Sequence, residues 1–182
     1  MARRVLAFPL AVHMGTDICR IPRIYTMLGG PRGGRFIRRI LADEELVQPR
    51  RCIAAILLRD GGHRRGGRRP ASPAPAPAQQ RDRRDPELWT AAVFLAGRFA
   101  AKEAAIKAHP HRRLTFHDVV IENRAGGADA EGARSGVPSA RIKGGPGAQE
   151  EDQVAMLSIS HDGDYATAVC MGFEAGPGGA RG

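Results

Sequence analysis

The feature that most constrains this fold is a hairpin signature near the C-terminus. The segment VAMLSISHDGDYATAVCMGF holds two apolar stretches on either side of Asp162-Gly163. An Asp-Gly pair between such stretches is typical of a tight turn that joins two antiparallel strands. The sequence therefore predicts an antiparallel sheet.

The remaining segments add helices and further strands to this hairpin. Asp85 is a good N-cap, Pro86 suits the first helical position, and Pro110 ends the helix that follows, although Gly97 could divide it. Residues 20–41 contain apolar positions at helical spacing. Strands are expected at 4–18, 114–123 and 139–143. The order of strand, helices and strands predicts an α+β fold, with an antiparallel sheet packed against helices.

A low-complexity segment interrupts the chain at about 59–85. It combines arginine-rich flanks with an alternation of proline and alanine, which favours an extended, solvated chain. The stretch from Arg32 to Arg84 holds 14 arginines and 5 acids, which accounts for the whole net charge of +9. We expect one domain over residues 1–173, with a disordered insert at about 59–85 and a flexible tail at 174–182.

Composition excludes several classes of protein. The three cysteines form no CxxC pair, which argues against a disulfide scaffold or a zinc site. No apolar run approaches the roughly 20 residues that a membrane span needs. The N-terminal segment shows no clear targeting signal, so a cytoplasmic or a mitochondrial location is expected. Nucleic-acid binding by the arginines stays an alternative, although residues 59–85 contain no aromatic residue for base stacking.

The helix at 95–109 carries the most informative charges. Glu103 and Lys107 lie four residues apart, which fits a surface ion pair worth about 0.3–0.5 kcal/mol. Arg98 and Lys102 are like charges at the same spacing, and an external anion would relieve their repulsion. The second interpretation is a polyanion site in which cations contact phosphates and Glu103 helps to hold Mg²⁺, which commonly uses one or two carboxylates.

Two further segments offer candidate groups. Asp17 follows an apolar stretch, so it caps a turn or supplies a second carboxylate to a site. His161 is an inert turn residue or a hydrogen-bond donor to a substrate. A serine hydrolase is excluded, because Ser160 and His161 are strand neighbours that point to opposite faces.

Four segments, in order GTDICRIPRI, LAGRFAAKEAAIKA, LTFHDVVI and SISHDGDYATAV, resemble the motifs of holo-acyl-carrier-protein synthase, the small 4′-phosphopantetheinyl transferase. The resemblance implies that fold and a Mg²⁺-dependent transfer of phosphopantetheine from coenzyme A to a serine of apo-acyl carrier protein. The reaction supports fatty acid biosynthesis and releases adenosine 3′,5′-bisphosphate.

The resemblance also implies roles for individual residues. Asp17 and Glu103 match the metal-binding acids, and Lys107 matches the lysine near the reacting phosphate. His161 matches the family's histidine close to the nucleotide, and Arg23 is similar to an arginine that faces the acidic carrier protein. Glu103, Lys107 and His161 are the expected catalytic residues, with Glu103 or a metal-bound water as the base. The expected coenzyme A contacts are Arg98, Lys102, Lys107 and His161.

The sequence departs from the family pattern in two places. The family's glycine-rich turn is replaced by HPHRR after Ala108, which puts the cofactor contacts of that turn in question. Short bacterial members form trimers with active sites between subunits, and a homotrimer is possible here. A non-catalytic relative that only binds the carrier protein is a further alternative, against which Asp17, Glu103 and Lys107 argue together.

Overall fold

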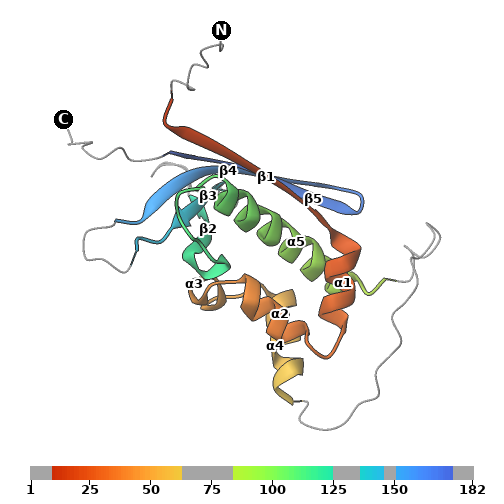
Figure 1. Cartoon of the computed structure of the whole chain (residues 1–182). Coiled ribbons are helices and arrows are strands. Elements are labelled where there is room, and N and C mark those ends of the chain that lie inside the picture. The colour runs from red at the N-terminus through yellow and green to blue at the C-terminus, as the bar shows by residue number, and fades with distance from the viewer. Residues whose placement is uncertain (1–9, 63–83, 125–135, 146–150, 174–182) are drawn as a thin grey trace.

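The computed structural model describes residues 10–62, 84–124, 136–145 and 151–173. The predicted tail at 174–182 lies outside these ranges, as do most of the predicted insert and the start of the first predicted strand. Within them, the chain forms one antiparallel sheet and a set of helices on one of its faces (Figure 1). The expected α+β class is confirmed.

The sheet has five strands in the order β1-β5-β4-β3-β2, and every neighbouring pair is antiparallel. The predicted C-terminal hairpin supplies its centre, and β1 lies at one edge beside β5. The strands are β1 (Val12–Arg20), β2 (Val119–Arg124), β3 (Val137–Ile142), β4 (Gln153–Asp162) and β5 (Tyr165–Phe173).

Helix α5 (Pro86–Lys107) is the central helix of the fold and lies across the inner face of the sheet (Figure 1). The Asp85 carboxylate accepts a hydrogen bond from the Leu88 N–H at 3.0 Å, as expected of an N-cap. Small side chains allow α5 to pack closely against the strands. Its buried alanines are Ala91, Ala92, Ala96, Ala100, Ala101, Ala104 and Ala105.

The other helices cover the side of α5 that faces away from the sheet (Figure 1). They pack through isoleucine and leucine side chains, including Ile24, Leu28, Ile37 and Ile53. These helices are α1 (Ile21–Gly29), α2 (Gly33–Ile40), α3 (Asp43–Leu46) and α4 (Arg51–Gly62), and the short 3-10 turn η2 (Phe116–Asp118) precedes β2.

Three local expectations differ from the structure. Gly97 does not divide α5, which is continuous from Pro86 to Lys107, and a Cβ atom at Gly97 would only reach van der Waals contact with Ile159 of β4 at 3.4 Å. Residues 59–62 belong to helix α4, so the regular structure extends further than predicted. The hairpin turn consists of Gly163 and Asp164, because Asp162 still pairs with Tyr165, and Gly163 has a φ of +54°.

Gly15 decides how closely β1 approaches α5. A Cβ atom at this position would lie 2.0 Å from the Ala104 carbonyl oxygen and 2.7 Å from the Ala108 nitrogen. Only glycine permits this contact between strand and helix backbones. The next inward-facing residue of β1, Asp17, is therefore held beside the last turns of α5.

Candidate functional site

The edge strand β1 presents one carboxylate to the helix side of the sheet. Gly15 and Cys19 are buried on this side, whereas Met14 and Ile18 are exposed on the other. Asp17 shares the inner face with Gly15 and Cys19, since side chains alternate along a strand. Its side chain is only 16% exposed.

Lys107 ties Asp17 to the end of α5. Its Nζ donates to Asp17 Oδ1 at 2.8 Å and to the Thr16 carbonyl oxygen at 3.0 Å. The other carboxylate oxygen, Asp17 Oδ2, is buried and has no hydrogen-bond partner among the described residues. The structure thus leaves one acidic oxygen unused at a site where burial makes an unpaired acceptor costly.

Glu103 lies one turn before Lys107 on α5. No described residue forms an ion pair with its half-buried carboxylate, and Lys107 pairs with Asp17 instead. The simple surface ion pair between Glu103 and Lys107 is therefore wrong for this structure. Residues four apart on a helix have Cβ atoms about 5–6 Å apart, so Glu103 is a neighbour of the Lys107–Asp17 pair.

Arg23 lies on the same flank of the molecule. It is exposed on α1, its Nη2 lies 3.8 Å from Cys19 Sγ, and its guanidinium lies 5.3 Å from the centroid of the Phe99 ring. Phe99 is four residues before Glu103 on α5. Arg23, Glu103, Lys107 and Asp17 therefore follow one side of α5, which we call the β1 flank.

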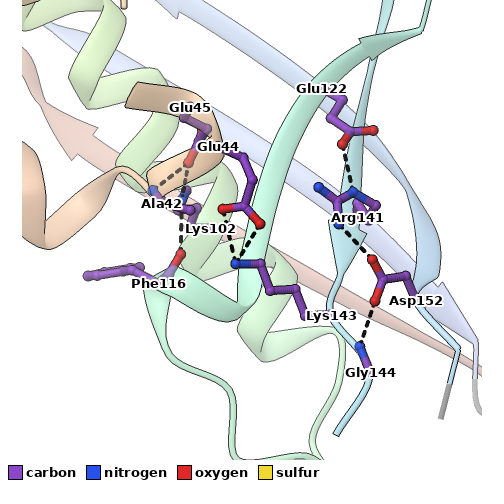
Figure 2. A network of polar contacts seen from close by, with 10 residues as sticks. All are labelled: Ala42, Glu44, Glu45, Lys102, Phe116, Glu122, Arg141, Lys143, Gly144 and Asp152. Carbon is purple, nitrogen blue, oxygen red and sulfur yellow. Dashed lines mark hydrogen bonds and ion pairs between the residues drawn. The ribbon is translucent and has the colours of Figure 1, made fainter. Parts of the chain in front are cut away.

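Lys102 has a different role from the predicted one. It is fully buried, donates to Glu45 of α3 and donates to the Phe116 carbonyl oxygen at 2.9 Å (Figure 2). Glu45 also accepts from the Ala42 N–H at 2.9 Å. Burial lowers the pKa of Lys102, and the Glu45 carboxylate partly offsets this effect. The expectation of a phosphate contact is not supported, because α3 and η2 cover the amine.

A pocket on the other flank of α5 gathers Arg98 and His161. The pocket has a volume of about 400 Å³ and lies where α5 meets the end of β4. The Arg98 Nε lies 3.8 Å from Glu45 Oε1, and burial lowers the pKa of Arg98. The other residues lining it are Arg50, Trp89, Thr90, Val93, Phe94, Gly97, Asn123, Gly136, Pro138 and Ile159. We call this the Arg98 pocket.

The predicted site residues thus form two groups in one chain. Successive α5 residues turn by about 100°, so Arg98 and Glu103 are separated by roughly 140° around the helix. Asp17, Glu103, Lys107 and Arg23 lie on the β1 flank, Arg98 and His161 line the Arg98 pocket, and Lys102 belongs to neither group.

Sequence reasoning missed three contributors to these sites. Glu45 is the buried partner of Lys102 and Arg98, and its only sequence signal is the acidic run that begins α3. Arg50 and Phe94 line the Arg98 pocket, and neither has a distinctive spacing from the predicted residues.

The HPHRR turn is packed against the sheet. His109 is buried, its Nδ1 lies 2.7 Å from the Ala105 carbonyl oxygen, and Gly172 of β5 packs against its ring. The rings of His111 and His13 contact each other with centroids 5.3 Å apart. The turn is therefore stabilised by contacts that a glycine-rich turn would lack.

Three further features concern metal clusters, cysteines and membrane-spanning helices. No cluster of three or more His, Cys, Asp or Glu side chains suited to a metal occurs among them. The three cysteines are free. In the part of the chain that the structure covers, no helix has the length and apolarity to cross a membrane. Residues 63–83, which hold much of the predicted arginine-rich insert, lie outside that part.

Comparison with known proteins gives close relatives, although no family model matches. The chain is 34% identical to the mitochondrial 4′-phosphopantetheinyl transferase B of Aspergillus fumigatus over 173 residues, which cover 92% of this chain and 97% of that protein. It is 30% identical to the holo-[acyl-carrier-protein] synthase of Geobacillus kaustophilus, with 92% of this chain and 93% of that protein covered.

Solved structures show the same fold. The ACPS–CoA complex from Chronobacterium ammoniagenes matches with a TM-score of 0.51 and 24% identity, covering 91% of this chain and 99% of that one. The holo-ACP-synthase from Plasmodium yoelii matches with a TM-score of 0.50 and 23% identity, covering 87% and 91% of the two chains. With relatives of at least 30% identity aligned over nearly their whole length, this chain belongs to the 4′-phosphopantetheinyl transferase (holo-acyl-carrier-protein synthase) family.

Proposed function

We propose that this chain transfers the 4′-phosphopantetheine arm of coenzyme A to a serine of apo-acyl carrier protein. The reaction releases adenosine 3′,5′-bisphosphate and supplies the carrier protein for fatty acid biosynthesis. The family and the motif order support the activity. The observation that carries the site assignment is the Asp17 carboxylate, which Lys107 holds through Oδ1 while Oδ2 stays unpartnered and buried.

The β1 flank fits a magnesium ion. Mg²⁺ is bound by one or two carboxylates together with substrate phosphates. Asp17 Oδ2 and the Glu103 carboxylate are two such groups, and both are without a partner among the described residues. These two residues would hold the ion, which when bound supplies positive charge to the pyrophosphate of coenzyme A.

The protein's own groups account for the remaining steps. The serine oxygen of the carrier protein attacks the phosphorus that bears the pantetheine arm, and the bond from this phosphorus to the bridging oxygen breaks. Glu103 would accept the serine proton in this proposal, with a metal-bound water as the alternative base. The half-exposed Lys107 ammonium stabilises the charge that develops on the leaving phosphate oxygen.

The other predicted residues bind the two substrates. Arg98 and His161 line one pocket and are suited to the nucleotide part of coenzyme A. Arg23 projects from α1 beside Phe99, where its exposed guanidinium can meet an acidic carrier protein. Mitochondria are the compartment we propose, since the Aspergillus relative is a mitochondrial protein.

We propose that the chain assembles as a homotrimer, as its resemblance to the short bacterial family members implies. No described residue covers the outer face of β1, β4 and β5, and this face is apolar: Met14, Ile18 and Met156 are exposed by 70%, 65% and 72%. Exposed apolar faces of this kind mark interaction surfaces. Self-association would cover this face, and it can bring the β1 flank of one copy towards the Arg98 pocket of another. Light scattering on the purified protein tests the expected three-copy mass, and a monodisperse monomer would refute it.

The activity is tested by mass spectrometry of apo-acyl carrier protein. Incubation with this chain, coenzyme A and Mg²⁺ should add the mass of phosphopantetheine, and a chelator should prevent the addition. Glu103→Gln and Asp17→Asn should each lower the rate by about 10²–10³-fold, as expected for a lost preorganised charge contact. Near-normal transfer by the Glu103→Gln protein would refute the assignment of the β1 flank as the catalytic site.

A further inference from the structure

Two arginines flank one aromatic ring in the Arg98 pocket. The Arg50 guanidinium carbon lies 4.7 Å from the Phe94 ring centroid, and that of Arg98 lies 5.0 Å from it. Arg50 comes from the connection between α3 and α4. Its carbonyl oxygen accepts from the Ile53 and Ala54 N–H groups at 2.8 and 3.0 Å, which fixes its backbone at the start of α4.

The charges around this ring are not balanced. No Asp or Glu is among the described residues that line the Arg98 pocket. The nearby carboxylate of Glu45 is shared, since it pairs closely with Lys102 and reaches Arg98 at 3.8 Å. Glu44 pairs with Lys143 at 2.8 Å (Figure 2). Arg50 has no carboxylate partner among the described residues, so the pocket keeps an excess of positive charge.

Stacking on the ring does not by itself explain this arrangement. An exposed cation–π contact is worth about 0.5–1 kcal/mol, whereas two guanidinium groups around one ring repel each other. Burial lowers the pKa of Arg98, the Glu45 carboxylate offsets part of this effect, and the nearby Arg50 charge lowers the pKa further. A bound anion would reduce the repulsion between the two guanidinium groups and would compensate the buried charge of Arg98. Guanidinium groups also match the geometry of phosphate oxygens.

We propose that Arg50 is a second phosphate-binding arginine of the Arg98 pocket, specific for the phosphate monoester on the ribose of coenzyme A. This inference rests on the proposed function. The pyrophosphate is assigned to the β1 flank, where Lys107 and the two carboxylates lie. The monoester is the other phosphate of coenzyme A, and its two charges suit a site with two guanidinium groups. Arg50 therefore makes the enzyme select coenzyme A over 3′-dephospho-coenzyme A.

The test compares coenzyme A with 3′-dephospho-coenzyme A as substrates and as ligands in calorimetry. The substitution Arg50→Ala should raise the KM and Kd for coenzyme A about tenfold or more, because losing one hydrogen bond to a charged group has an effect of this size. The kcat of this variant, and its KM and Kd for the dephospho compound, should stay unchanged. Arg50→Lys should recover only part of the selectivity, because an ammonium lacks the planar fork.

Arg51→Ala is the matched control. Arg51 is the adjacent exposed cation at the start of α4, and it lines none of the described pockets. The proposal for Arg50 is overturned if Arg50→Ala weakens the binding of coenzyme A and of 3′-dephospho-coenzyme A equally, or if Arg51→Ala causes the same loss of selectivity. Neither result would affect the proposed transferase activity. If the unmodified protein neither binds coenzyme A nor transfers its arm, both proposals fall together.

Discussion

The substitution Lys102→Met tests whether Lys102 stabilises the fold or takes part in catalysis. Lys102 is fully buried, and its partner Glu45 is 7% exposed. Removing one member of a buried ion pair costs about 3–5 kcal/mol, because the remaining charge is left uncompensated. For a domain of this size that corresponds to a fall in Tm of about 6–20 °C. Transfer activity per folded molecule should be unchanged.

Lys107→Met is the matched control on the same helix. The Lys107 side chain is 50% exposed and Asp17 is 16% exposed, so loss of this pair should lower the Tm less than loss of the Lys102–Glu45 pair, in which both side chains are buried. It should, however, remove most transfer activity. Circular dichroism melting and the mass-spectrometric transfer assay measure the two properties in parallel.

One result for Lys102→Met would contradict a structural role for this lysine. If Lys102→Met leaves the Tm within about 2 °C of the unmodified protein and abolishes transfer, the buried pair does not stabilise the fold and Lys102 contacts phosphate after all. Adding Glu45→Gln to Lys102→Met should restore part of the lost stability, because the exchange removes the unpaired carboxylate.

Further predictions concern packing, thiols and the insert. Gly15→Ala should lower both the Tm and the transfer rate, because its Cβ would lie 2.0 Å from the Ala104 carbonyl oxygen; an unchanged melting curve would show that β1 can move away without cost. Burial raises the pKa of Cys170 to about 11 and also raises that of Cys19, so a thiol reagent at pH 8 should modify only the half-buried Cys52 in the folded protein. Because the unfolded Cys170 thiol ionises near pH 9, this residue should reduce stability as the pH rises from about 9 to 11, measured by urea unfolding. Replacing residues 63–83 with a glycine-serine linker that keeps Arg84 should preserve transfer, and loss of folding would make the segment structural.

Local signals in the sequence were sufficient for the class of fold and for the long helix. The cap at Asp85, the proline at Pro86 and the Asp162-Gly163 hairpin signature depend on neighbouring residues, so they can be recognised without tertiary information. The family motifs likewise pointed to Asp17 and Lys107, which the structure brings to 2.8 Å although 90 residues separate them.

Only the tertiary structure decided which charges are available to a substrate. Spacing along α5 makes Lys102 and Lys107 look alike, but α3 and η2 bury the first, while the second reaches the edge strand. The same holds for Arg50, whose position beside Phe94 depends on how the α3–α4 connection packs against α5. Periodicity specifies the face of a helix on which a side chain lies, whereas burial and charge pairing depend on segments distant in the sequence that cover that face.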